Sequence, residues 1–115
     1  MPRVTKALAA KAKHKKVLKA TKGHYGARSR LYKTAKQSNV KALQYAFRDR
    51  RNKKRTFRSL WISRISAALL PLEVSYSRFI NQLSKANIKL DRKSLAGIAF
   101  SEPDTFKKIV EKVRV

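Results

Sequence analysis

The stretch from Arg48 to Leu72 constrains the fold more than any other part of the sequence, because its two halves have opposite requirements. The first half carries six basic residues between Arg48 and Arg55, at helical angles that leave no apolar side. The second half contains no Gly or Pro before Pro71, and its large or apolar residues share one helical face: Phe57, Trp61, Ile65, Ala68 and Leu72. The sequence therefore predicts one helix that begins where burial is impossible and ends where burial is required.

The charge of the chain divides at about residue 58. Residues 1–58 contain 20 basic residues and one acidic residue, a net charge of +19, whereas residues 59–115 contain 10 basic and five acidic residues, a net charge of +5. Like charge at the higher density opposes compaction, so a polyanion is the expected partner. We therefore predict a basic nucleic-acid-binding extension over residues 1–58, called the arm below, and a small globular domain over residues 59–115.

Several function classes lack the residues that they need. The chain has no cysteine, which excludes a disulfide framework, a thiolate zinc site and a cysteine nucleophile. It has no Gly-rich phosphate loop, no Ser–His–Asp set and no paired catalytic carboxylates, and His14 and His24 have neither carboxylate partners nor ligand spacing. No apolar run approaches the roughly 20 residues of a membrane span. We expect no enzymatic activity, cofactor, metal or small-molecule substrate, and no membrane partner.

The arm reads as helical. Ala and Lys predict a short helix over residues 4–21, and Gly23 and Gly26 predict a turn after it. From Arg28 to about Leu70 there is no Gly or Pro, which predicts one helix on the order of 60 Å long. Because basic residues lie on several sides of this helix, we expect anionic surface on more than one side of it, as for a helix threaded into folded RNA.

The remainder of the chain predicts a small helical domain, so the fold class is all-α. Ser75 and Asp91 are expected to cap two short helices, Asn87 to end the first of these, and Pro103 to open a third. The apolar residues of the three helices recur at helical spacing and are expected to face one core together with the Trp61 face: Tyr76, Phe79, Ile80, Leu83, Leu95, Ile98, Ala99, Phe106, Ile109, Val110 and Val113. No segment of this part alternates apolar and polar residues as a β-strand would.

Four segments, in order and at matching spacing, resemble the L-twenty family of bacterial large-subunit ribosomal proteins. They are residues 54–69 (KRTFRSLWISRISAAL), residues 11–37, residues 44–55 and residues 75–99. The resemblance implies a helical extension threaded into large-subunit rRNA, a helical C-terminal domain at the subunit surface, and neighbouring large-subunit ribosomal proteins as partners. It further implies a role early in subunit assembly and, in several bacteria, repression of the protein's own mRNA.

The resemblance also implies a location in the ribosome of the bacterial cytoplasm, although an organellar ribosome fits as well. The first 20 residues are basic and free of acids, which is also typical of a transit peptide. We favour a helix of the mature protein, because the same composition continues for another forty residues. The family pattern is broken between Leu70 and Val74, where Glu73 takes a position usually filled by Gly and Pro71 is expected to end the helix.

Side-chain chemistry and the resemblance together predict the RNA-binding residues. Arg can hold a phosphate with two donors and stack on a base, and Tyr25 and Tyr32 can stack on unpaired bases. The predicted set is Arg3, Lys13, His14, Lys15, Lys16, Lys19, Lys22, Tyr25, Arg28, Ser29, Arg30, Lys36, Gln44, Tyr45, Arg48, Arg50, Arg51, Lys54, Arg55 and Arg58. The alternative for each basic residue is a solvated charge on a helix, and for Asp49 we expect pairing within the helix.

Three further interpretations stay open. Ser75, Ser77 and Arg78 are candidate RNA contacts of the second domain, although capping explains the serines nearly as well. Trp61 is a candidate for base stacking, but its place on the apolar face favours packing. As other function classes, we considered a DNA-binding or nucleoid protein that uses the helices over 75–86 and 92–100, and a cationic peptide that lies on a membrane surface.

Overall fold

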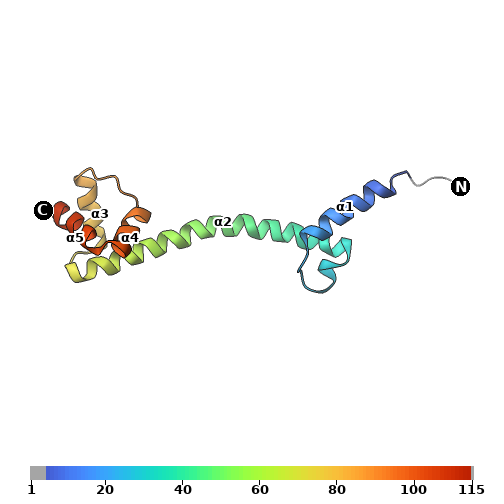
Figure 1. Cartoon of the computed structure of the whole chain (residues 1–115), viewed down its shortest axis with the longest axis horizontal. Coiled ribbons are helices and arrows are strands. Elements are labelled where there is room, and N and C mark those ends of the chain that lie inside the picture. The colour runs from blue at the N-terminus through green and yellow to red at the C-terminus, as the bar shows by residue number, and fades with distance from the viewer. Residues whose placement is uncertain (1–4, 115) are drawn as a thin grey trace. The chain divides into compact units, whose positions relative to one another are not determined.

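The computed structural model describes residues 5–114, and every regular element in that range is helical (Figure 1). The α-helices are α1 (Ala7–Ala20), α2 (Tyr32–Leu69), α3 (Tyr76–Lys85), α4 (Arg92–Ser101) and α5 (Pro103–Val113), with short 3-10 helices η1 (Gly26–Ser29) and η2 (Leu70–Leu72). The predicted all-α class, with one very long helix and a helical C-terminal part, is confirmed. The chain divides into a first unit that ends at Arg51 and a second unit that begins at Asn52, and α2 contributes to both.

The long helix begins at Tyr32, so the predicted start at Arg28 is wrong by four residues. A 3-10 turn occupies the intervening residues, and Gly26 enters it with a φ of 60°. The Ser29 hydroxyl donates a hydrogen bond to the Gly26 carbonyl at 3.0 Å. A serine that bonds to nearby backbone offers the chain an alternative to the helical pattern, which explains the delay. The end of α2 at Leu69 agrees with the predicted end at about Leu70.

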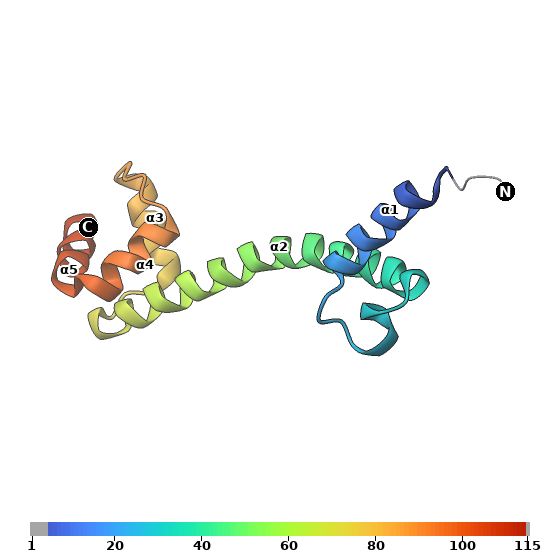
Figure 2. The ribbon, with the colours of Figure 1, turned by 45° about the vertical axis from the view of Figure 1, so that its right-hand side comes forward.

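The first unit is held by α1, the loop that follows it and the start of α2 (Figure 2). Thr21 is fully buried, and its hydroxyl donates to the carbonyl of Val17 at 3.2 Å, which closes the last turn of α1. Ala35 on α2 is also fully buried, whereas α1 itself contributes no buried residue. Burial in the first unit is therefore slight, as the sparse apolar residues of this region predicted.

The second unit has one core formed by the end of α2 together with α3, α4 and α5, which gather around it in both ribbon views (Figures 1 and 2). The rings of Phe79 and Phe106 lie at the centre of this core, with centroids 5.7 Å apart and planes inclined by 60°. Trp61 packs against the core and is half-buried, which confirms its packing role. The apolar residues predicted on α3, α4 and α5 are all in the core or packed against it.

Two details of the predicted core were wrong. Phe57 was placed on the core face, but it is 42% exposed and lies outside the core, because the neighbouring helices cover α2 only from Trp61 onward. Leu69 and Ala96 are absent from the predicted core residues, yet Leu69 is fully buried and Ala96 is only 1% exposed. Which side of a helix is covered depends on its neighbours in space, and the spacing of one segment does not contain that information.

The predicted helix starts in the second unit are confirmed. The Ser75 hydroxyl accepts the N–H of Arg78 at 3.4 Å, and the Asp91 carboxylate accepts the N–H of Ser94 at 2.7 Å. Hydrogen bonds from the Ser94 side chain and then from its backbone N–H hold the pKa of Asp91 below its ordinary value. Pro103 occupies the first turn of α5.

The end of α3 is a Schellman motif built around Asn87, which confirms the predicted stop. Asn87 has a φ of 57°, the Ile88 N–H donates to the Leu83 carbonyl at 3.1 Å, and the Asn87 N–H donates to the Ser84 carbonyl at 3.2 Å. These two bonds satisfy carbonyl groups that the helix leaves unpaired. Asparagine tolerates this left-handed conformation better than most residues.

The same motif closes η2 around Glu73. Its φ is 55°, its N–H donates to the Leu70 carbonyl at 3.2 Å, and the Val74 N–H donates to the Leu69 carbonyl at 3.5 Å. Glu73 is thus in the left-handed region, at the position where the family pattern has glycine. A glutamate pays a steric cost there that glycine does not.

Candidate nucleic-acid interface

The predicted RNA-binding residues lie on three consecutive elements of the chain, and all of those that the structure describes are exposed except the half-buried Ser29. Arg3 lies outside the described residues. On α1 are Lys13, His14, Lys15, Lys16 and Lys19. On the loop and η1 are Lys22, Tyr25, Arg28, Ser29 and Arg30. On α2 are Lys36, Gln44, Tyr45, Arg48, Arg50, Arg51, Lys54, Arg55 and Arg58.

The middle of α2 is open on every side. Each residue from Phe47 to Leu60 is exposed, so the basic side chains of this stretch point in all directions around the helix axis. Within residues 5–114 the only ion pair joins the Arg48 Nε and Asp49 Oδ1 atoms, which are 3.0 Å apart, and this confirms that Asp49 pairs within the helix. Both side chains are 61% exposed, so the pair adds little stability. The other basic side chains are not neutralised by carboxylates of the described chain.

Aromatic rings are interleaved with these cations. The Arg48 Cζ atom lies 4.8 Å from the ring centroid of Tyr45, the Arg51 Cζ atom lies 4.7 Å from that of Phe47, and the Lys53 Nζ atom lies 5.9 Å from that of Phe57. Exposed aromatic and guanidinium planes offer stacking surfaces to bases without regard to sequence.

Phe47 and Phe57 were missed as candidate binding residues. They are 55% and 42% exposed. The signal that points to them is their spacing from a basic residue, since Phe47 precedes Arg51 and Lys53 precedes Phe57 by one helical turn each.

Three residues of the first unit with rings, Tyr32, His24 and Tyr25, differ in how free their rings are. The His14 ring stacks on that of Tyr32, with centroids 3.9 Å apart, so His14 covers one face of Tyr32, and stacking of a base on the other face stays a prediction. His24 was read as an RNA contact or a solvated residue, but its Nδ1 atom lies 2.6 Å from the Ser38 Oγ atom. Tyr25 is 93% exposed and remains available for stacking.

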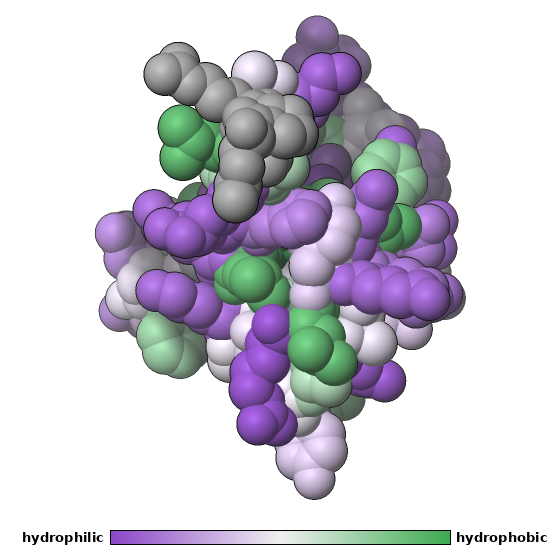
Figure 3. Space-filling model, turned by 90° about the vertical axis from the view of Figure 1, so that its right-hand side faces the viewer, coloured by the Kyte–Doolittle hydropathy of each residue, from purple (hydrophilic) through white to green (hydrophobic). Residues whose placement is uncertain are grey.

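The surface of the protein is mostly hydrophilic in the view of Figure 3. In the space-filling view of Figure 3, hydrophilic side chains project on all sides, and hydrophobic side chains appear as small separate areas between them. Such a surface favours a charged, hydrated partner over a continuous apolar one.

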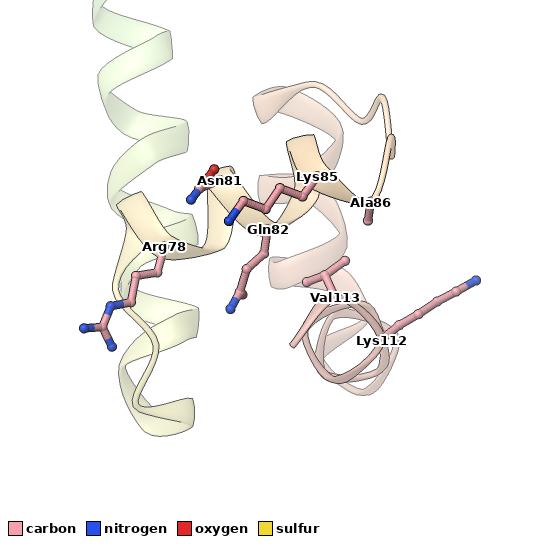
Figure 4. A pocket seen from close by; sticks show the side chains of 7 residues that line it. All are labelled: Arg78, Asn81, Gln82, Lys85, Ala86, Lys112 and Val113. Carbon is pink, nitrogen blue, oxygen red and sulfur yellow. The ribbon is translucent and has the colours of Figure 1, made fainter. Parts of the chain in front are cut away.

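The second unit carries a smaller basic area around a pocket of about 430 Å³ between α3 and the end of α5 (Figure 4). Arg78, Lys85 and Lys112 bring three cations to its lining, and no carboxylate lines it. The Gln82 Oε1 atom is buried there without a hydrogen-bond partner. Arg78, a candidate contact from the sequence, is therefore part of a basic pocket, whereas Ser75 is occupied by capping.

Neither a metal site nor a membrane-spanning helix occurs within residues 5–114. No group of three or more His, Cys, Asp or Glu side chains is placed to hold a metal ion. None of the helices in that range combines the length and the apolar character needed to cross a bilayer.

Comparison with known proteins gives one consistent result. The model of the family described as "Ribosomal protein L20" matches residues 3–109. The chain is 57% identical over 114 residues to the "Large ribosomal subunit protein bL20" of Francisella philomiragia subsp. philomiragia, covering 99% of this chain and 97% of that protein. It is also 57% identical to the protein of that name from a Bradyrhizobium species, covering 99% of this chain and 96% of the relative.

Proposed function

The chain belongs to the ribosomal protein L20 family, and from this premise we propose that its arm binds large-subunit rRNA directly and promotes early assembly of the subunit. The observation that carries the proposal is the exposure of every residue from Phe47 to Leu60 on a helix with cations on all sides. Membership in a family of ribosomal proteins also agrees with the prediction that the chain is not an enzyme.

The arrangement of charge favours folded RNA over a single duplex. A helix that lies on a duplex needs cations on one face, and the opposite face then stays in water. Cations on all faces of α2 gain from phosphates on all faces, which only RNA that surrounds the helix provides. The exposed rings of Tyr25, Phe47 and Phe57 add stacking surfaces for unpaired bases, which folded RNA presents at its loops and bulges.

The proposal has three further parts, which concern protein partners, the protein's own mRNA and the location of the chain. Neighbouring large-subunit ribosomal proteins are further partners, since the relatives are named as proteins of that subunit, and Leu70 and Phe100, each 79% exposed, are free to contact them. Binding to the protein's own mRNA follows if that message presents phosphates and unpaired bases to the arm as the rRNA does. The family places the chain in the ribosome of the bacterial cytoplasm, and an organellar ribosome fits the same chemistry.

The proposal is tested by the salt dependence of binding to a large-subunit rRNA fragment. Replacing Arg50 and Arg51 together by alanine removes two exposed cations, so fewer counterions are released on binding. We expect weaker binding and a slope of log K against log salt that is less steep by about one to two units. The matched control is the double replacement of Lys107 and Lys108, which are exposed on α5, and we expect its slope to be unchanged.

An unchanged slope for the Arg50 and Arg51 variant would show that these side chains do not contact phosphate. Duplex DNA tested at the same salt distinguishes the nucleoid alternative, because equal affinity for DNA and rRNA favours a DNA-binding protein. Anionic lipid vesicles test the membrane alternative. Since the arm lacks a broad apolar face, we expect any vesicle binding to disappear at moderate salt.

A further inference from the structure

The loop between α1 and α2 and the N-terminal part of α2 line an open pocket of about 570 Å³ within the first unit. Its volume lies within the range of about 300–1,000 Å³ that is typical of sites for small molecules. Two of the residues that line it, Arg28 and Tyr45, belong to the predicted RNA-binding set, and a third, His24, is a histidine for which the sequence allows an RNA contact. The pocket depends on the way the loop folds back, which residue spacing does not reveal.

One contact between the loop and α2 shapes the pocket. The His24 Nδ1 atom lies 2.6 Å from the Ser38 Oγ atom, and both residues line the pocket. Gly23 and Gly26 on either side of His24 have φ angles of 89° and 60°, which favour glycine, although neither has an atom within 4 Å of the position of an added Cβ. Backbone conformation therefore shapes this turn.

The lining combines three kinds of chemistry. Arg28 and Lys41 supply two cations, and no carboxylate lines the pocket. Gln37 supplies an amide that both donates and accepts hydrogen bonds. Ala42 and the ring of Tyr45 supply apolar surface.

We propose that this pocket accepts one unpaired nucleotide of the RNA that the arm binds, with the base against Ala42 and Tyr45 and a phosphate at Arg28 and Lys41. The amide of Gln37 then hydrogen-bonds to the edge of the base, as glutamine side chains do in base recognition. Cations alone would suit any phosphate. The amide and the apolar wall beside them add contacts that only a base uses.

The nucleotide has to be unpaired. In an A-form helix the major groove is too deep and narrow for side chains, and the shallow minor groove presents base edges but no base face, so a paired base cannot enter a concave site on the protein. A base that has left the stack presents its face and its edge together. The pocket thus distinguishes a bulge or loop from a duplex, a distinction that the evenly charged surface of α2 does not make.

The inference rests on the proposed function, and its test separates the two. Two RNA probes are compared at the same salt: a fully paired hairpin, and the same hairpin with one unpaired adenosine in its stem. We expect the wild-type chain to bind the second probe about tenfold more tightly, since stacking and base contacts are made only there. Equal binding of both hairpins overturns the pocket and leaves the proposed function standing, whereas binding of neither overturns both.

The variant Ala42→Leu fills the pocket without changing charge, and both residues are good helix formers. We expect it to bind both hairpins with the affinity that the wild type has for the paired one. The matched control Ala46→Leu makes the same change one turn further along α2, outside the pocket lining, and should keep the tenfold preference. A preference that survives Ala42→Leu overturns the proposal.

A second variant decides the question if Ala42→Leu does not fold correctly. Gln37 is exposed, and Gln37→Leu removes the amide while it keeps a side chain of similar size on the helix. We expect the preference for the unpaired adenosine to fall, with affinity for the paired hairpin unchanged. If circular dichroism shows that Ala42→Leu has lost helix, Gln37→Leu alone decides, and an unchanged preference in that variant rejects the pocket as a nucleotide site.

Discussion

The imidazole ring of His14 lies on the phenol ring of Tyr32, with centroids 3.9 Å apart and planes inclined by 24°. This stack joins α1 to the first turn of α2 across the loop between them. The contact between His24 and Ser38 holds the loop itself. Together with the buried Thr21, these contacts link the helices of the first unit, whose described residues form no large apolar core.

We predict that Tyr32→Ala lowers the helix content of the free protein. An aromatic pair contributes about 0.5–1.5 kcal/mol beyond its burial, and little else holds α1 against α2. Far-ultraviolet circular dichroism at fixed salt measures the change. The matched control is Tyr25→Ala, because Tyr25 is 93% exposed and belongs to no ring pair among the described residues. Equal losses in the two variants would mean that the stack does not hold α1.

We predict that the arm fluctuates in the free protein at physiological salt and becomes fully helical when rRNA is added. Like charges three and four residues apart weaken an isolated helix, and phosphates remove this repulsion. The measurement is circular dichroism with and without an rRNA fragment, with the second unit expected to stay folded throughout. A fully helical arm without RNA contradicts this prediction.

We predict that Glu73→Gly stabilises the second unit by about 0.5–1 kcal/mol, because the steric cost that a φ of 55° imposes on glutamate exceeds the extra backbone entropy that glycine loses on folding. Urea unfolding followed by the fluorescence of Trp61, the single tryptophan, reports on this unit. The control Asn87→Gly occupies an equivalent position with a φ of 57°, but asparagine already tolerates it, so the gain should be smaller. A larger gain at Asn87 would show that steric strain at Glu73 is not the cause.

We predict that Asp91 makes the stability of the second unit depend on pH in the acid range. Its pKa in the folded chain lies below the unfolded value, so its contribution is present above the unfolded pKa and is lost as the pH falls through the folded pKa. The comparison is with Asp91→Ser, which keeps a cap but does not titrate. As the pH falls from about 6 to about 2, the wild type should lose more stability than this variant. Parallel unfolding midpoints would rule the effect out.

Local signals predicted much of the fold. The caps at Ser75 and Asp91, the stop at Asn87 and the core face of α5 each depend on residues within one or two turns, so the sequence contains them. The exposure of Phe57 depends instead on how far the other helices extend along α2. The spacing of apolar residues within one segment does not show how far the neighbouring helices reach along it.

The candidate site was less predictable from the sequence than the fold was. Charge and composition point to the arm, and the exposure of its basic residues agrees with that choice, but which of them contact RNA stays a prediction. The stack of His14 on Tyr32 and the contact of His24 with Ser38 join residues 14 or more positions apart. The pocket beside Gln37 follows from that tertiary contact, so no local pattern predicts it.

The open stretch from Phe47 to Leu60 has a consequence for the lifetime of the protein in the cell. Only the backbone hydrogen bonds of the helix protect it, and such a segment opens locally at little cost in free energy. Proteases that cut after lysine and arginine find many cleavage sites there, whereas a copy enclosed by a ligand shields them. We therefore expect unbound chains to be cut before bound ones, so that the amount of intact protein follows the amount of its binding partner.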